Sequence, residues 1–184
     1  MTARVPDPLP PDVRPSRFSH LVVKTGRLPA MVDWYRTVLN AQPMFETDRV
    51  CFLTFDDEHH RIMLGQADDC PPRDPKTAGV VHWAYAFDHA SQLVSAYERL
   101  RDAGITPSVC INHGFTTSLY YLDPDGNEVE LAVDNFPDKA SMNEWFAGGP
   151  FDRNFVGVPF DPEEMVKLHR DGVAIGAHYA EHYE

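Results

Sequence analysis

Apolar and polar positions follow one order twice along the first two thirds of the chain. In each round a short apolar run comes first, then a stretch with apolar residues at helical spacing, then three runs that suit strands. The first round has FSHLVVKT, a helix near 29–39 and strands near 42–46, 50–55 and 61–65. The second has GVVHWAYAF, a helix near 90–103 and strands near 107–111, 118–122 and 128–133. The pattern predicts an α+β fold of two βαβββ modules, at about 17–68 and 79–135.

The two modules can be overlaid on their closing segments. FDDEHHRIML aligns with LDPDGNEVEL, so that residue 55 falls on 122, His60 on Asn127 and Met63 on Glu130. His20 and His82 both open the first strand of their module. A unit repeated in this way predicts a curved sheet around a central cavity, with the two histidines brought together by pseudo-symmetry.

His20, His82 and Glu130 form the candidate metal site. In EVELAV the glutamates alternate with apolar residues, so one strand face can pack in the core while the other carries a carboxylate into the cavity. Taken singly, each histidine is more commonly a core residue and the glutamate a solvated one. Their joint placement favours the facial triad of non-haem Fe(II) oxygenases, which leaves coordination positions open. Met63, at the fourth symmetric position, is a poor ligand for a hard divalent ion, which favours three protein ligands over four.

Two segments lie outside the repeat. Residues 1–16 are rich in proline and suggest an extended arm. Residues 136–184 form a C-terminal extension, in which ASMNEWFA and FDPEEMVKLHRDG predict short helices, the second with an Asp cap and a Pro. The many aromatic residues of this extension predict burial, either against its own domain or in a homodimer contact.

Composition narrows the class of protein. With 43% hydrophobic and 24% charged residues, the chain can bury a real core. A formal net charge of −12 disfavours nucleic acid and anionic membrane surfaces as partners. No apolar run is long enough for a membrane span, and the N-terminus lacks the apolar centre of a secretory signal. Three cysteines, Cys51, Cys70 and Cys110, show no metal-like spacing and suggest reduced thiols, so we expect a cytoplasmic protein.

Several motifs together resemble a known family. HLVVKT, DWYRTVL, EHHR, VVHWAYAF and NHGFTTSLYYLDPDGNEVEL, in this order, resemble single-domain type I extradiol ring-cleaving dioxygenases of the vicinal oxygen chelate superfamily. The resemblance covers about residues 17–135. It implies a dioxygenase that uses Fe(II) and O₂ to open a catechol-type ring next to its diol, and the same ligands would also suit Mn(II). We expect the chain to lack the extra N-terminal domain of the larger members.

The same superfamily contains glyoxalases, fosfomycin-resistance enzymes and bleomycin-binding proteins, which leaves two alternatives. One is a metal-dependent lyase or isomerase, against which Met63 argues because it replaces a fourth ligand. The other is a non-catalytic protein that binds a drug, against which the complete triad argues.

The resemblance also implies roles for individual residues. His20, His82 and Glu130 match the iron ligands, His60 matches the acid/base histidine, and Tyr120 matches a tyrosine that hydrogen-bonds near the bound substrate oxygen.

Two of these assignments have competing interpretations from the residues themselves. Strict alternation back from Met63 puts His59 and Arg61 on its face and turns His60 away, whereas the resemblance favours His60. His113 resembles a second active-site histidine, but it lies closer to Tyr120 in sequence than in two-domain members, and a loop histidine beside Gly114 is the other interpretation.

Overall fold

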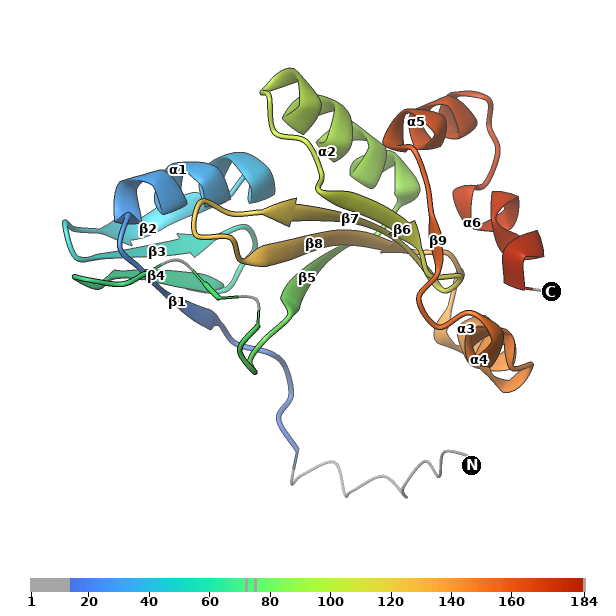
Figure 1. Cartoon of the computed structure of the whole chain (residues 1–184), viewed down its shortest axis with the longest axis horizontal. Coiled ribbons are helices and arrows are strands. Elements are labelled where there is room, and N and C mark those ends of the chain that lie inside the picture. Colours follow the sequence, from blue (N-terminus) through green and yellow to red (C-terminus); the bar gives the residue numbers. More distant parts are fainter. Residues whose placement is uncertain (1–13, 72, 75, 184) are drawn as a thin grey trace.

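The computed structural model of the chain describes residues 14–71, 73–74 and 76–183, so most of the predicted N-terminal arm lies outside the described residues. Both predicted modules are present (Figure 1). The first consists of β1 (Leu21–Thr25), α1 (Leu28–Leu39), β2 (Gln42–Glu46), β3 (Val50–Thr54) and β4 (Ile62–Gln66). The second consists of β5 (His82–Phe87), α2 (Ala90–Asp102), β6 (Val109–Asn112), β7 (Thr116–Leu122) and β8 (Glu128–Asp134). The α+β prediction is confirmed.

The strands form two sheets rather than the single sheet that the sequence suggested. One has the order β1-β4-β3-β2, and the other β5-β8-β7-β6-β9, where β9 (Val158–Pro159) comes from the C-terminal extension. In both sheets the first strand pairs in parallel with the last strand of its own module. No strand of one module pairs with a strand of the other among the described residues, so the two sheets meet through side chains.

Strand register confirms the overlay of the modules. Val22 pairs with Met63 in the first sheet, and Ala84 pairs with Glu130 in the second. Since residues paired side by side point to the same face of a sheet, Met63 occupies the place in the first module that Glu130 has in the second. The partner of Met63 on β3 is Phe52, and the partner of Glu130 on β7 is Tyr120.

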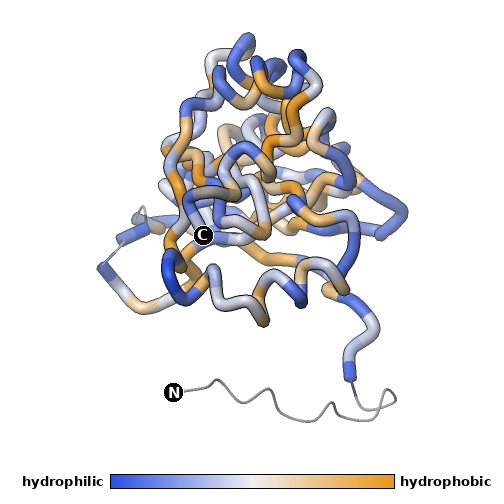
Figure 2. Tube along the Cα trace, turned by 90° about the vertical axis from the view of Figure 1, so that its right-hand side faces the viewer, coloured by the Kyte–Doolittle hydropathy of each residue, from blue (hydrophilic) through white to orange (hydrophobic). Residues whose placement is uncertain are grey.

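The two module helices cover one face of the sheets because each has an apolar stripe. In α1 the buried residues include Met31, Tyr35 and Val38, and the helix ends where Asn40 takes a left-handed conformation at φ 52°. In α2 the buried residues include Leu93 and Tyr97. Hydrophobic stretches run through the middle of the molecule, and hydrophilic ones mark the turns (Figure 2). The opposite face of each sheet is left free of α1 and α2, so it is available for a site.

Contacts across the module boundary join the two halves. Val38 of α1 belongs to the hydrophobic core of the second module, and Val129 of β8 belongs to that of the first. The Tyr35 hydroxyl donates a hydrogen bond of 3.1 Å to a carboxylate oxygen of Asp123, in the turn before β8. Asp123 is buried, and it also accepts backbone N–H bonds from Asp125 and Asn127 at 2.9 Å. The predicted DPDG turn thus ties the second module to the first.

The C-terminal extension packs mainly on the second module. It contains α3 (Lys139–Ala147), α4 (Pro150–Arg153), α5 (Pro162–Arg170), α6 (Ile175–His178) and a final 3₁₀ turn (Ala180–Tyr183). Both predicted helices are present, and Asp161 caps α5 through the Glu163 amide. In Figure 1, α5 lies beside α2, whereas α3 and α4 lie beyond the opposite face of the sheet. None of the helices among the described residues is long and apolar enough to cross a membrane.

Candidate active site

The open face of the second sheet carries three of the candidate side chains. Glu130 on β8 lies between Ala84 of β5 and Tyr120 of β7, its register partners on either side. His82, two residues before Ala84, points to the same face. Glu130 and Tyr120 are buried, and His82 is about one third exposed (36% of its side chain). The site is therefore shielded on the sheet side and open on one side.

The distance between His82 and Glu130 is compatible with two ligands of one ion. The His82 Nε2 atom lies 3.0 Å from a carboxylate oxygen of Glu130. Two donors each about 2.1 Å from a divalent ion, and at right angles to one another, would be separated by about 3.0 Å. An imidazole nitrogen and a carboxylate oxygen are also the donor types of the facial triad. This pair fits a divalent first-row metal.

Tyr120 and His113 lie next to the pair formed by His82 and Glu130. The His113 Nε2 atom lies 2.8 Å from the Tyr120 hydroxyl, and the Tyr120 ring meets the His82 ring edge-on at 5.3 Å. Burial, together with the charge and hydrogen bond of Glu130, raises the pKa of Tyr120. Burial lowers the pKa of His113 despite the opposing charge of Glu130. Both groups are therefore neutral near neutral pH, and they can share a hydrogen bond that a substrate oxygen could join.

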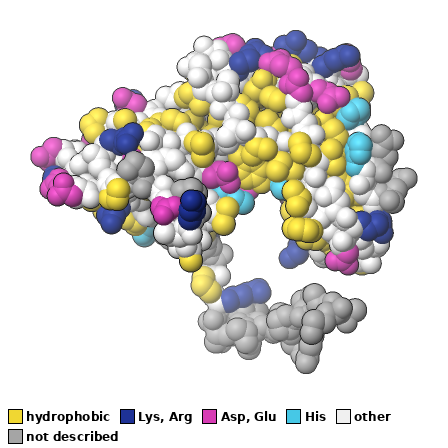
Figure 3. Space-filling view, in the orientation of Figure 1, with side chains coloured by type: hydrophobic (Ala, Val, Ile, Leu, Met, Phe, Trp, Pro, Cys, Tyr) yellow, Lys and Arg dark blue, Asp and Glu magenta, His cyan; other side chains and the backbone are white. Residues whose placement is uncertain are grey.

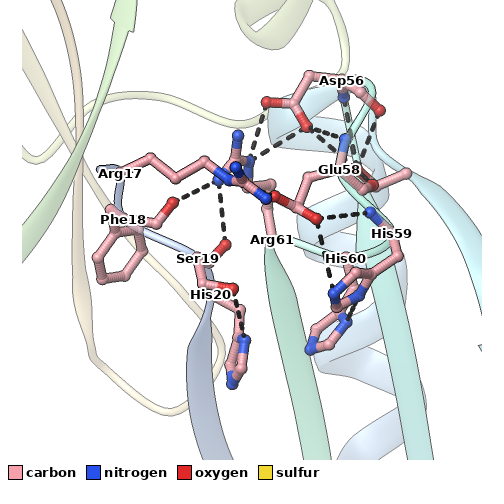
Figure 4. A network of polar contacts seen from close by, with 10 residues as sticks. Arg17, Phe18, Ser19, His20, Asp56, Glu58, His59, His60 and Arg61 are labelled. Atoms are coloured by element: carbon pink, nitrogen blue, oxygen red, sulfur yellow. Dashed lines mark hydrogen bonds and ion pairs between the residues drawn. The ribbon is translucent and has the colours of Figure 1, made fainter. Parts of the chain in front are cut away.

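His20 and His60 lie together on the first module (Figure 4). Their rings are 4.5 Å apart, and the His60 ring also stacks on Phe52 at 4.7 Å. Because Phe52 is the register partner of Met63, this contact puts His60 on the Met63 face. Strict alternation fails here because β4 begins only at Ile62, so the backbone before it need not keep the pleat. Burial and the charges of His20 and His59 lower the pKa of His60.

The predicted site residues thus form two groups. His82, Glu130, Tyr120 and His113 are joined in the second module, and His20 and His60 in the first. Across residues 14–71, 73–74 and 76–183, no three His, Cys, Asp or Glu side chains converge closely enough to hold a metal. The approach of His20 to His82 and Glu130 therefore stays a prediction.

A cavity of about 380 Å³ lies between the first strands of the two modules. Its volume falls within the range typical of small-molecule sites. Phe18 and Leu21, on either side of His20, line it from the first module, and Ala84 and Ala86 line it from β5. In Figure 3 the molecule is hollowed beneath the sheets, with histidine and acidic side chains near the top of the hollow and hydrophobic side chains at its sides. The candidate residues are not in this lining, but Leu21 follows His20 in the chain and Ala84 is the register partner of Glu130.

Two neighbours of the site were not singled out by sequence reasoning. A Glu128 carboxylate oxygen lies 3.6 Å from His82 Nδ1, the ring nitrogen that faces away from Glu130. Arg61 bonds to the backbone just before His20. The overlay of the modules could have pointed to both residues, because Arg61 falls on Glu128 at the same offset that places Met63 on Glu130. Arg61 lies two residues before Met63, and Glu128 lies two residues before Glu130.

Comparison with known proteins gives matches over most of the chain. Residues 17–131 match the family described as the Glyoxalase/Bleomycin resistance protein/Dioxygenase superfamily. The chain is 49% identical over 147 residues to "Biphenyl-2,3-diol 1,2-dioxygenase 2" of Rhodococcus globerulus, covering 79% of this chain and 77% of that protein. It is 42% identical over 159 residues to "Biphenyl-2,3-diol 1,2-dioxygenase 3" of the same organism, covering 85% and 84%.

Solved structures agree on the fold. A glyoxalase/dioxygenase from Nostoc punctiforme superposes with a TM-score of 0.57 at 18% identity, over 71% of this chain and 99% of that one. A lactoylglutathione lyase from Agrobacterium tumefaciens gives a TM-score of 0.52 at 19% identity, over 65% and 94%. Such low identities support the two-module architecture and carry no statement about the reaction.

Proposed function

Because the chain belongs to the glyoxalase/bleomycin resistance protein/dioxygenase superfamily, we propose that it is a metal-dependent extradiol dioxygenase that opens the ring of a biphenyl-2,3-diol or a related catechol. The observation that carries the proposal is the 49% identity to a biphenyl-2,3-diol 1,2-dioxygenase over 79% of the chain. The paired His82 and Glu130 support it, because that chemistry needs an open metal site.

Three residues would hold the metal: His20, His82 and Glu130. Fe(II) is the ion we propose, with Mn(II) as the competing ion, since imidazole and carboxylate donors suit both. When bound, the ion supplies Lewis acidity toward the diol and a template that brings diol and O₂ together. Met63 leaves the fourth symmetric position without a hard donor, so substrate and O₂ can reach the remaining positions.

The remaining site residues would handle protons and orientation. His60, beside His20, would take a proton from the substrate hydroxyl and return it later, because a neutral imidazole can act as a base near neutral pH. The Tyr120 hydroxyl and His113, which share a hydrogen bond, would hold a substrate oxygen from the second module, whereas His60 belongs to the first. The cavity between the modules would bind the aromatic ring, with Phe18 and Leu21 excluding water.

The direct test is anaerobic reconstitution of the purified protein with Fe(II) or Mn(II), followed by exposure to air with either biphenyl-2,3-diol or catechol. Ring opening next to the diol produces coloured products, so absorbance spectra follow the reaction. We expect turnover of the biphenyl diol with one of the two metals. Absence of turnover in a protein shown to have bound stoichiometric metal would contradict the proposal.

We also propose a homodimer. Phe155 and Val156, in the loop of the extension before β9, are 70% and 52% exposed. Most other aromatic residues of the extension are already in contact with the domain; for example, Phe146 and Phe151 pack on Phe115. Adjacent exposed apolar residues are typical of contact surfaces. Light scattering should show a dimer that Phe155→Asp weakens, and a monomer at all concentrations would rule the dimer out.

A further inference from the structure

Arg61, directly before β4, is fixed by hydrogen bonds of both its backbone and its side chain. Its backbone N–H donates to the Leu53 carbonyl at 2.8 Å, and its carbonyl accepts from the Leu21 amide at 2.9 Å. Its guanidinium Nε donates to both carboxylate oxygens of Asp56, at 3.1 and 2.9 Å. Only 20% of the Arg61 side chain is exposed. The position of the guanidinium is therefore well defined.

The free end of this guanidinium reaches the chain just ahead of His20. Its Nη1 atom donates to the carbonyl of Phe18 and, at 3.1 Å, to the carbonyl of Ser19 (Figure 4). His20 itself precedes β1, which starts at Leu21. The two carbonyls that Arg61 binds thus belong to the residues through which the N-terminal segment enters the site.

Asp56 is suited to anchor the arginine. Burial raises the pKa of its carboxyl, but hydrogen bonds from the Glu58 amide and from Arg61 outweigh this and lower the pKa below its usual value. The carboxylate is thus charged at working pH. Arginine can use one edge of its planar fork for a carboxylate and another for backbone carbonyls, which a single ammonium group cannot reproduce.

We propose that Arg61, anchored by Asp56, is a positioning residue that fixes the backbone at Phe18 and Ser19 and so presents the imidazole of His20 to the metal. The inference rests on the proposed function, in which His20 is a ligand. A ligand outside the hydrogen-bonded strand has more backbone freedom than His82, which opens β5 within the sheet. Metal sites need their ligands held to within about 0.5 Å, so this freedom must be removed by a contact such as the one Arg61 provides.

The second module supports this assignment from the equivalent place. Glu128, onto which Arg61 falls in the overlay, has a carboxylate oxygen 3.6 Å from His82 Nδ1. A carboxylate that accepts the outer N–H of a ligating histidine fixes the orientation of its ring, whereas Glu128 lies in ion-pair range of His82 and beyond hydrogen-bond distance. In both modules, therefore, the residue two before the Met63/Glu130 position lies beside the histidine of that module, next to the ring in one and bonded to the preceding backbone in the other.

The experiment measures the affinity of the metal-free protein for Co(II), by competition with a chelating dye under anaerobic conditions, in four variants. Arg61→Gln and Asp56→Asn test the contact, and Arg61→Lys tests the need for the fork. Arg49→Gln is the matched control, because it removes another Arg–Asp pair of the same module, at 57% and 73% exposure and apart from the Arg61 network. We expect a loss of about 10- to 100-fold for Arg61→Gln, as for other outer-shell partners of metal ligands. Arg61→Lys should be intermediate and Arg49→Gln unchanged.

The sign of the effect separates positioning from simple electrostatics. Removing a positive charge near a cation should tighten its binding, and removing a negative charge should weaken it. Positioning predicts that Arg61→Gln and Asp56→Asn both weaken Co(II) binding, although they change the net charge in opposite directions. Tighter or unchanged binding in a folded Arg61→Gln protein would overturn the inference. Should this variant fail to fold, unchanged affinity in both Arg61→Lys and Asp56→Asn would overturn it equally.

His20→Ala, measured in the same series, distinguishes failure of this inference from failure of the proposed function. If His20→Ala loses Co(II) affinity while Arg61→Gln keeps it, only the role of Arg61 is wrong. If His20→Ala binds Co(II) as the wild type does, the proposed ligand set is wrong, and the role of Arg61 falls with it.

Discussion

The two modules share one strand register, but their open faces differ in chemistry. Where the second has Tyr120 and Glu130 as paired neighbours on β7 and β8, the first has Phe52 and Met63 on β3 and β4. Each module contributes one histidine near the start of its first strand. A duplicated scaffold has thus kept its geometry while the carboxylate and the phenol remained on one copy only. The second module provides the candidate carboxylate ligand and the phenol, and the first provides apolar side chains, one candidate ligand and the candidate acid/base His60.

Positions that are equivalent in the two modules but differ in chemistry allow matched variants. The pair Glu130 and Met63 is expected to show the largest effect. Glu130→Ala removes a candidate ligand, so the protein should lose its metal and its ring-cleaving activity. Met63→Ala removes side-chain atoms at the equivalent position, which is half-buried, so it should lower stability by less than the about 2 kcal/mol of a core position while metal content stays normal. Elemental analysis and thermal unfolding measure both. Full metal occupancy in Glu130→Ala would show that the difference between the modules does not concern the metal.

The second pair consists of adjacent histidines of the first module. His60 stacks on Phe52 and lies beside His20, whereas His59 is 68% exposed and contacts Glu58. His60→Phe should lower kcat for ring cleavage by about 10²- to 10⁴-fold, the usual contribution of a positioned acid or base, with metal content intact. His59→Phe should cost much less. Equal losses, or a larger loss for His59→Phe, would assign the proton transfer differently.

The third pair concerns the aromatic residues at equivalent positions of the two modules, Tyr120 and Phe52. Tyr120→Phe removes the hydroxyl that bonds to His113, and we expect kcat/KM to fall about tenfold, the equivalent of one hydrogen bond of about 1.4 kcal/mol. Phe52→Tyr gives the first module the same hydroxyl and should leave kcat/KM within about twofold, since it recreates no network with Glu130. A similar loss in both variants would indicate a packing effect in place of a hydrogen bond.

The sequence predicted the modules because periodicity and turn residues are local, but it could not predict contacts that depend on packing. The helices, the succession of strands along each module and the equivalence of Met63 and Glu130 all follow from the repeat. The separation into two sheets does not, since nothing local determines whether β1 meets β5 through backbone or side chains. Alternation could not place His60, because the residue precedes its strand. The contact of Arg61 with Phe18 and Ser19 joins segments over 40 residues apart, and no spacing rule encodes it.

The smallest expected effect on activity concerns a hydrogen bond that joins the modules. Tyr35→Phe removes the hydroxyl that donates to Asp123 and leaves the ring in the core. A buried hydrogen bond to a charged acceptor contributes about 1.5–3 kcal/mol, so the free energy of unfolding should fall by about that amount at a pH where Asp123 is ionised. Activity of the folded enzyme should be unchanged, because neither residue belongs to the candidate site.

The pH dependence makes this last prediction specific. Burial raises the pKa of Asp123 above its ordinary value, although bonds from Asn127 and Tyr35 oppose the shift. Ionisation of Asp123 therefore costs stability as the pH rises through the folded-state pKa, and the Tyr35 hydroxyl reduces that cost. Without the hydroxyl, the pKa of Asp123 should rise further. The deficit of Tyr35→Phe should then be largest above this pKa and should shrink as the pH falls and the carboxyl takes up its proton. Urea unfolding of both proteins between mildly acidic and neutral pH measures this difference. A deficit that is the same across that range would mean that the bond contributes by packing alone, and that the charge on Asp123 plays no part in joining the modules.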